Sequence, residues 1–372
     1  MMLVLILVAA GVVLGFAYLS SAALKAQVAS SYSDLSRARY LAESGVNHGL
    51  WTLRFEPDSI VDTMLGPYYA DGTEDYYFVT AQEVPGNDGY FQVTAIATVD
   101  GVQRSSAATV YRAAAPQVEV SHGLLVGSGF TWTPSALSID GDGHVNDMFF
   151  NMADIDGNAS ASSFLWDPWG HVSGATEQFA DHIELPAVSA NQYADGYTFG
   201  SIEHTPAVHT ERDWTQGNPL NGGAAVTADN MGGVVKIVPE DGNDAVLHNN
   251  VDFTGTLIIE GDLYLHGRNI NLSSVEGFPA LIVTGKVYVT NSARNVTING
   301  LVCADGGIQS YRHSRNASTT INGAVVSKTG GYSSSLYGNH RLNFEASLAR
   351  VYDMTLPPQQ RAPSVKIVDW ND

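Results

Sequence analysis

The sequence has little cysteine and little positive charge. A single cysteine, Cys303, occurs among 372 residues, which excludes a disulfide within the chain. Lys and Arg number 18 against 38 Asp and Glu, so the formal net charge is −20. Because this excess of negative charge opposes binding to phosphate backbones, we expect no nucleic-acid partner.

Charge of either sign is absent from the N-terminal run. From Met1 to Leu24 there is no Asp, Glu, Lys or Arg, and as a helix this run would extend about 36 Å, enough to cross a bilayer. A secretory signal would begin with basic residues and end after a shorter apolar core. This run instead continues into residues 25–55, where apolar residues recur three and four positions apart. We therefore expect one long helix over residues 1–55, and we expect its apolar half to make filament or membrane contacts through Met1, Leu3, Leu5, Leu7, Val12, Leu14, Phe16 and Leu19.

The second half of this helix carries a distinctive segment, Tyr40-Leu41-Ala42-Glu43-Ser44-Gly45. Following an uncharged apolar run, it resembles the N-terminal region of type IV pilins, particularly the minor pilins, with Tyr40, Ala42, Glu43 and Gly45 as the motif residues. The resemblance implies that a prepilin peptidase removes a leader before Met1. It also implies that the helix is anchored in the inner, cytoplasmic membrane and then packs with copies of the chain in a filament core. The glutamate that the family often has at its fifth mature position is Leu5 here. The alternative is an ordinary single-pass anchor.

Strand patterns follow the helix. Runs over residues 76–82, 90–99 and 102–111 alternate apolar with polar residues, and Asp100-Gly101 between the last two is a strong hairpin signal. We expect a small antiparallel sheet over residues 56–116 that packs on the second half of the helix.

From residue 117 onward, short apolar runs recur at a nearly constant interval. An interval of about 20–24 residues is typical of a parallel β-helix, in which each coil stacks on the next. A second series, at positions 295–300 and 319–323, repeats at the same interval. Residues 143–230 show no clear period, so we expect an irregular insertion there. The equivalent positions of the first series are Val235, Leu257, Leu281, Leu301 and Ala324.

The expected fold class is therefore α+β, with three parts. A pilin-like helix covers residues 1–55, a small antiparallel β head covers 56–116, and a mainly β domain covers 117–372. This last part is expected to be a parallel β-solenoid with the insertion near 143–230. All but four of the basic and all but two of the acidic side chains lie after Arg54, so the outer part is strongly acidic.

Two kinds of modification or ligand are suggested by local patterns. Acidic and amide side chains on glycine-rich turns are typical calcium ligands, although ordinary turns of Asx type are the favoured explanation. The calcium candidates are Asp140, Asp142, Asn146, Asp147, Asp154 and Asp156. We expect no cofactor, with calcium as the alternative that these residues suggest. Candidate N-glycosylation sequons begin at Asn158, Asn271, Asn295 and Asn316.

Other side chains allow further alternatives. Four histidines in the insertion, His171, His182, His204 and His209, allow a transition-metal site, although their spacing does not demand one. Aromatic residues offer either packing or a glycan surface: Trp132, Phe149, Phe150, Trp166, Trp169, Tyr193, Tyr197 and Trp214. Carboxylates on the coils, with basic neighbours, allow a carbohydrate-active enzyme: Asp252, Glu260, Asp262 and Asp305, with Lys286, Arg294 and Arg312. No catalytic signature accompanies them, so we assign no catalytic residues and expect no enzyme.

The favoured hypothesis is a structural subunit of an extracellular type IV pilin-like filament on the cell surface. It would be anchored in the membrane before assembly and would polymerise through its N-terminal helix. The first alternative is a minor or tip pilin, or a membrane-anchored adhesin, that binds glycans or another cell. The second is a tethered β-helix carbohydrate-active enzyme.

Overall fold

The structure is a computed structural model whose chain forms two compact units. Unit 1 comprises Met1–Ala114 and Pro363–Asp372, and unit 2 comprises Ala115–Ala362. The structure describes residues 2–169, 171–193, 196–199, 202–214, 226–227, 229–240, 244–310, 315–332 and 338–371.

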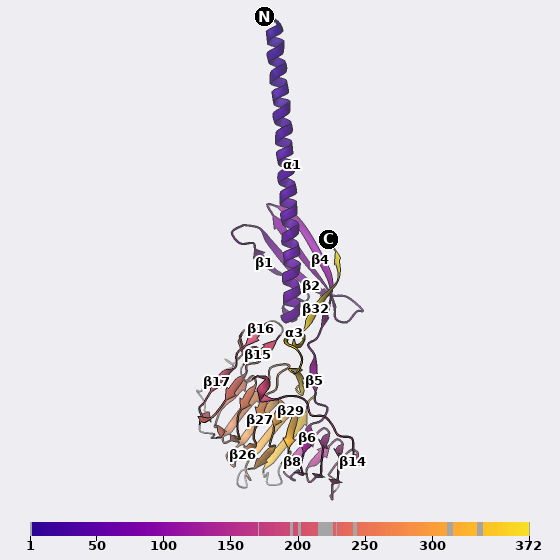
Figure 1. Cartoon of the computed structure of the whole chain (residues 1–372), viewed down its shortest axis with the longest axis vertical. Helices are drawn as coiled ribbons and strands as arrows, with labels where there is room; N and C mark the ends of the chain where they lie inside the picture. The colour runs from indigo at the N-terminus through magenta and orange to yellow at the C-terminus, as the bar shows by residue number, and fades with distance from the viewer. Residues whose placement is uncertain are drawn as a thin grey trace. The chain divides into compact units, whose positions relative to one another are not determined.

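Unit 1 begins with one long helix, α1 (Met2–Phe55) (Figure 1), which is followed by a single turn, α2 (Pro57–Ile60). This agrees with the expected helix over residues 1–55. Every described side chain from Leu7 to Ser33 is exposed, and buried positions begin at Ala38. By length and composition α1 is the one helix among the described residues that could cross a membrane.

The sheet of unit 1 is antiparallel and has five strands in the order β1-β2-β3-β4-β32. Asp100 and Gly101 both have positive φ (46° and 79°), which is the geometry of the tight turn predicted between β3 and β4. The strands are β1 (Leu65–Tyr69), β2 (Tyr76–Glu83), β3 (Tyr90–Val99), β4 (Val102–Ala113) and β32 (Ser364–Asn371).

Strand β32 corrects the expected domain boundaries. The sequence pattern places everything from residue 117 to 372 in the outer domain, yet β32 pairs with β4, with Ser364 opposite Ala113. Its alternating apolar residues complete the small sheet, and Trp370 packs against the core of unit 1. Unit 2 is therefore an insertion between two neighbouring strands of unit 1.

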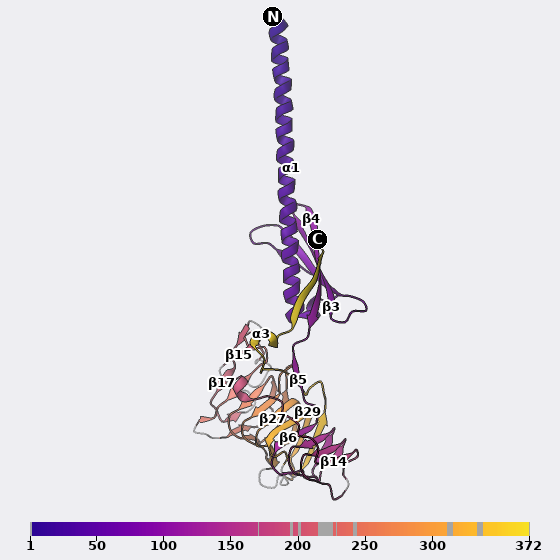
Figure 2. The same cartoon turned by 45° about the vertical axis from the view of Figure 1, so that its right-hand side comes forward.

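Unit 2 is built from short parallel strands stacked in long ladders (Figure 2). The longest ladder has the order β14-β12-β9-β6-β29-β27-β25-β22-β19-β17. Its strands are β6 (Leu124–Ser128), β9 (Gly143–Val145), β12 (Ala159–Ala161), β14 (Thr176–Gln178), β17 (Ala207–His209), β19 (Val235–Ile237), β22 (Leu257–Ile259), β25 (Leu281–Val283), β27 (Arg294–Ala304) and β29 (Ser318–Thr329).

Two further rows of parallel strands run beside the longest ladder. One row joins β21 (Asp252–Thr254), β24 (Arg268–Ser273), the first halves of β27 and β29, β30 (Asn339–Phe344), β8 (Leu137–Asp140) and β11 (Asp154–Asp156). The other row contains β18 (Asp213–Trp214), β20 (Ala245–Leu247), β23 (Leu263–Leu265), β26 (Val287–Val289) and β28 (Ile308–Ser310), and also β7 (Thr131–Trp132), β10 (Phe149–Phe150) and β13 (Leu165–Trp166) as a separate three-stranded sheet.

The remaining elements of unit 2 lie outside these rows. Strands β5 (Gln117–Glu119) and β31 (Arg350–Tyr352) pair with each other, and so do β15 (Tyr197–Phe199) and β16 (Ile202–His204). Two short helices complete the unit, η1 (Ala190–Gln192) and α3 (Pro358–Arg361).

The chain enters the long ladder in its middle. It proceeds from β6 to one end at β14, crosses to the other end at β17, and returns through β19, β22, β25 and β27 until β29 pairs with β6. The described residues of this crossing chain, 179–193, 196–199 and 202–206, are called the crossover segment below. It packs on the outward side of the ladder, where Leu185, Val188 and Tyr193 join one apolar cluster with Leu125, Ile282 and Cys303.

The expected irregular insertion at 143–230 is wrong over its first part. Residues 143–169 and 171–178 contain regularly spaced parallel strands, in which Ile155 faces Ile139 and Ser160 faces His144. These coils are shorter than the later ones, in which Leu257 faces Leu281. A search at the longer period therefore misses them.

The predicted register is wrong at one step. Leu281 faces Val302 rather than Leu301. Because neighbouring residues of a strand point to opposite faces, Val302 lies in the inner core while Leu301 lies in the outer cluster with Cys303. The strand bends before this point at Gly300, which has a φ of 137° and faces Gly323, which has a φ of 136°. A Cβ on Gly323 would lie 2.4 Å from the Gly300 carbonyl oxygen, so glycine is needed there.

Candidate functional sites

The apolar half of α1 presents a long run of exposed apolar side chains. Side chains that would ordinarily be buried are more than half exposed here, including Leu14 at 71% and Phe16 at 72%. Leu7, Val12 and Leu19 are exposed in the same way. Met1 and the side chains of Leu3 and Leu5 lie outside the described residues. This half of the helix offers a continuous apolar surface with no partner among the described residues.

The motif residues lie where α1 begins to pack on the sheet. Ala42 is buried, and a Cβ on Gly45 would lie 2.7 Å from Cβ of Ala95, so both positions need small residues for the helix to approach β3. Tyr40 points to solvent, and Glu43 accepts a hydrogen bond from Nε of Arg39 at 3.0 Å. Within unit 1 this segment is therefore a packing motif, and Tyr40 is its exposed member.

One arginine fixes the helix to two loops of the sheet. Arg37 forms ion pairs with Asp75 and with Asp100, the latter at 3.2 Å, and lies 3.8 Å from Asp34. Asp75 is largely buried, whereas Arg37 is nearly half exposed. This cluster holds the first packed turn of α1 in place against these two loops.

The calcium candidates are distributed over several strands and turns, and most of them have protein partners. Oδ1 of Asp142 accepts the backbone N–H of Asn158 at 2.7 Å, and Oδ2 of Asp147 accepts that of Gly129 at 3.2 Å. Asn146 is bonded through both side-chain atoms to the backbone of Ile183 in the crossover segment. Asp140 and Asp156 lie side by side on β8 and β11. Among the residues that the structure describes, no three His, Cys, Asp or Glu side chains lie together as a metal site. Calcium binding stays a prediction.

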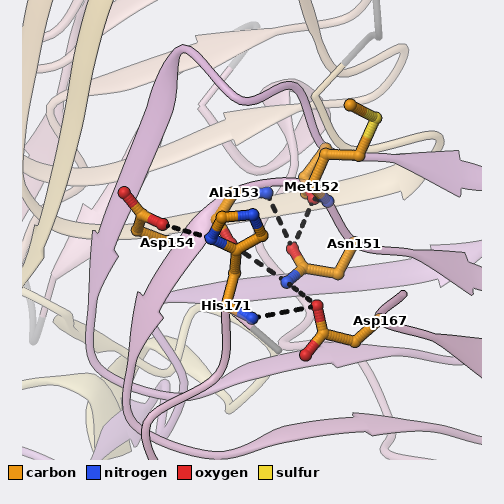
Figure 3. A network of polar contacts seen from close by, with 7 residues as sticks. Asn151, Met152, Ala153, Asp154, Asp167 and His171 are labelled. Carbon is orange, nitrogen blue, oxygen red and sulfur yellow. Dashed lines mark hydrogen bonds and ion pairs between the residues drawn. The ribbon is translucent and has the colours of Figure 1, made fainter. Parts of the chain in front are cut away.

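A buried asparagine organises the coil beside Asp154 (Figure 3). Oδ1 of Asn151 accepts hydrogen bonds from the hydroxyl of Thr133 at 2.6 Å and the N–H of Ala153 at 3.1 Å. Its amide nitrogen donates to the carbonyl oxygen of Ala153 and, more weakly, to Asp167 at 3.4 Å. His171 donates its backbone N–H to Asp167. These bonds hold two successive turns together.

The candidate histidines occupy unrelated environments. Nδ1 of His171 lies 2.7 Å from Oδ1 of Asp154, and His209 packs edge-on against Trp214. His204 is buried and stacks on Tyr197, and burial lowers its pKa. The transition-metal site stays a prediction without a cluster among the described residues to support it.

Asparagines form two side-chain ladders along the coils. In the first, Asn343 donates to Asn322 at 2.8 Å and Asn322 donates to Asn299 at 2.7 Å. In the second, Asn295 donates to Asn269 at 2.9 Å and Asn269 to Asn250 at 3.1 Å, and all three have left-handed backbone conformations. The sequence repeat already indicates the first ladder, because the Asn-Gly pair at 299–300 recurs at 322–323.

The sequons differ in what their asparagines do. The amide nitrogens of Asn158, Asn271 and Asn295 donate to Asp142, Asp252 and Asn269, respectively. Asn158, Asn295 and Asn316 are exposed, and Asn316 lies at a turn. Glycosylation stays a prediction.

The aromatic candidates separate into two groups. Phe149, Tyr193, Tyr197 and Trp214 are buried in the cores of unit 2. Trp132, Phe150, Trp166 and Trp169 lie on the outward side of the small sheet β7-β10-β13, with Phe130 beside them. This outward group is called the aromatic strip below.

Each of the carboxylates considered for catalysis has its own partner in the protein. Glu260 pairs with Nζ of the buried Lys236 at 2.6 Å, and Asp305 with Nζ of Lys328 at 2.7 Å. Asp262 accepts the backbone N–H of Lys286. Arg312 lies outside the described residues. That the chain is no enzyme stays a prediction.

Comparisons with known proteins give little. No family model and no curated protein sequence matches this chain. Among solved structures it is similar to the competence-associated pilin ComZ from Thermus thermophilus, with 13% identity and a TM-score of 0.34. The match covers 91% of this chain and 97% of that chain.

Proposed function

We propose that this protein is the structural subunit of a type IV pilin-like filament on the cell surface. The observation that carries the proposal is the apolar half of α1, which is uncharged from residue 7 to Leu24 and exposed throughout. Such a surface is unstable in contact with water, because the burial of each apolar side chain is favourable by about 1.5–3 kcal/mol. Copies of the same helix, or a membrane before assembly, would cover it.

The rest of unit 1 supports this role. The packed half of α1 is held by the sheet and by Arg37, so the apolar half begins from a rigid base. We propose that unit 2 is a parallel β-helix displayed outside the filament core. Three rows of parallel strands with an inner apolar core support that architecture. The proposal includes no enzymatic activity and no cofactor.

The test compares two acidic substitutions of exposed apolar residues. Leu14→Asp in α1 should abolish sedimentable filaments, because the charge would be buried on assembly. Val208→Asp, also more than half exposed but in unit 2, should leave assembly unchanged. Electron microscopy and sedimentation of both variants provide the readout. Filaments formed by the Leu14→Asp protein, or by a chain lacking residues 1–24, would contradict the proposal.

A further inference from the structure

The aromatic strip is built by strict alternation on three parallel strands. Thr131, Phe149 and Leu165 point into the core and are buried. Their neighbours Trp132, Phe150 and Trp166 stand opposite one another in register and point outward.

The rings of the strip touch one another along the row. The ring centroids of Trp132 and Phe150 lie 4.4 Å apart, and those of Phe150 and Trp166 lie 3.9 Å apart. Trp169 continues the row at 6.5 Å from Trp166 and is 59% exposed. Nε1 of Trp132 donates to Sδ of Met152 at 3.0 Å, which fixes this indole. The rings are thus held in place before any ligand arrives.

A groove extends from the aromatic strip toward strand β28. Phe130 and Trp132 form one side, and Gln309 and Lys286 are among the residues of the other. Lys286 is exposed and Gln309 is half-buried. Apolar ring faces beside a few polar groups are the usual composition of small-molecule and sugar sites.

Beyond the groove the outward row continues with further aromatic rings. Gln309 faces Tyr288, and Tyr288 faces Tyr264, with their two rings stacked at 4.7 Å and 20°. The two ladders on either side of the groove contain four inter-strand steps, roughly 19 Å at ~4.8 Å each. A surface of this length suits a chain of sugars better than a single one.

We propose that this outward row, from Tyr264 through the groove to Trp169, binds a neutral polysaccharide chain. Aromatic faces stack on the C–H faces of pyranose rings, and the amide of Gln309 and the ammonium of Lys286 bond their hydroxyls. A polyanionic glycan is disfavoured by the net charge of −20. The inference concerns unit 2 and does not depend on filament assembly.

The full chain, in a detergent without a sugar headgroup, is run in native gels that contain hydroxyethyl cellulose, galactomannan or dextran. We expect at least one of these neutral polymers to retard the protein. Trp132→Ala with Trp166→Ala should weaken that retention by about tenfold or more, on the scale of lost ring stacking. Tyr69→Ala, an exposed aromatic of unit 1, is the matched control and should change nothing.

Further variants make the test robust to misfolding. Trp169→Ala removes the most exposed ring of the row without touching the core, and circular dichroism checks every variant. No retention by any neutral polymer, retention only by polygalacturonate, or retention that survives in all strip variants would each overturn the inference. So would a folded strip variant whose main defect is loss of filaments, because the row would then be a contact between copies of the chain.

Discussion

Two glycines in α1 show how one missing carbon sets the distance between a helix and a sheet. A Cβ on Gly49 would lie 2.6 Å from Cγ2 of Val79 and 2.6 Å from Cγ1 of Val93. A Cβ on Gly11, in the exposed half, would have no atom within 4 Å apart from those of its own chain neighbours and the nearby helix backbone. Glycine is therefore needed for packing at position 49, and the isolated chain shows no such need at position 11.

We expect Gly49→Ala to destabilise unit 1 by about 1–3 kcal/mol, because the helix must move away from β2 and β3. This loss is the net effect after the ~1 kcal/mol that alanine gains in a helix interior. Thermal unfolding of the detergent-solubilised chain measures it. Gly11→Ala is the control and should be neutral or stabilising. Equal stability of the two variants would show that the sheet yields easily.

His144 gives unit 2 a dependence on pH. It is buried, its Nδ1 lies 2.7 Å from the hydroxyl of Ser160 and its Nε2 lies 2.8 Å from Oδ1 of Asn146. Burial lowers its pKa below the ordinary 6.5, with the charge of His182 acting in the same direction, while the bond to Asn146 and the charge of Glu177 oppose the shift.

Because the unfolded chain binds this proton more strongly, stability is complete above about pH 6.5 and falls as the pH drops below that value. The midpoint of denaturant unfolding should therefore decrease from about pH 7.5 to about pH 5.5. The decrease should be smaller in His144→Gln. An identical pH dependence in both proteins would assign the effect to other groups, such as His122, whose pKa is also lowered by burial.

At the scale of elements, unit 2 depends on rows that hold its coils in register. Asn322 is the central rung of the first asparagine ladder, since it donates to Asn299 and accepts from Asn343. Its side chain is partly buried, so its bonds are not easily replaced by water.

Asn322→Ala should cost about 1–3 kcal/mol, because it leaves polar groups on both neighbouring coils without their partners. Asn339→Ala, in the same row of strands but exposed, should cost little. Chemical unfolding followed by tryptophan fluorescence compares the two. A similar small loss in both would mean that backbone pairing alone fixes the register.

Much of the element order follows from patterns that the sequence repeats. The absence of charge to Leu24, the Asp100-Gly101 turn and the Asn-Gly pairs near 300 and 323 each predicted a feature that is present. The coils at residues 143–178 escaped prediction because their period is shorter and their strands, such as β10, hold only two residues. Strand β32 escaped because its partner β4 lies on the far side of unit 2 in the sequence, and no local pattern specifies such a distant pairing.

The candidate sites were harder to predict from the sequence than the order of the elements. Residue type alone could not separate Trp166, which faces outward, from Trp214, which fills the core. Their orientation depends on which residue of a short strand points inward, and a two-residue strand gives almost no alternation from which to decide. Asp142 shows the same difficulty, since its carboxylate accepts the N–H of the next coil, and that coil was not foreseen.

At the scale of the molecule, unit 1 should fold without unit 2. Ala113 and Ser364 are opposite each other at the end of an antiparallel pair, so two residues such as Asn-Gly can join them as a hairpin. A chain with residues 114–363 replaced in this way should keep the helix and sheet signals in circular dichroism and should still form filaments. A chain that stops at Ala113 is the comparison, and it should be less stable because the β4 edge lacks β32. If the joined chain is as unstable as the truncated one, unit 1 needs unit 2 to fold.

The antiparallel pairing of β5 with β31 brings the two ends of unit 2 together, with Gln117 opposite Tyr352. A domain whose ends are adjacent can be inserted into a turn of another domain without disturbing it. Unit 2 is in this sense a cassette: the β4–β32 hairpin accepts it in the place where a two-residue turn would serve. Unit 2 can therefore be exchanged, in evolution or by design, for another domain whose two ends are adjacent. The sequence of the apolar helix and its sheet need not change.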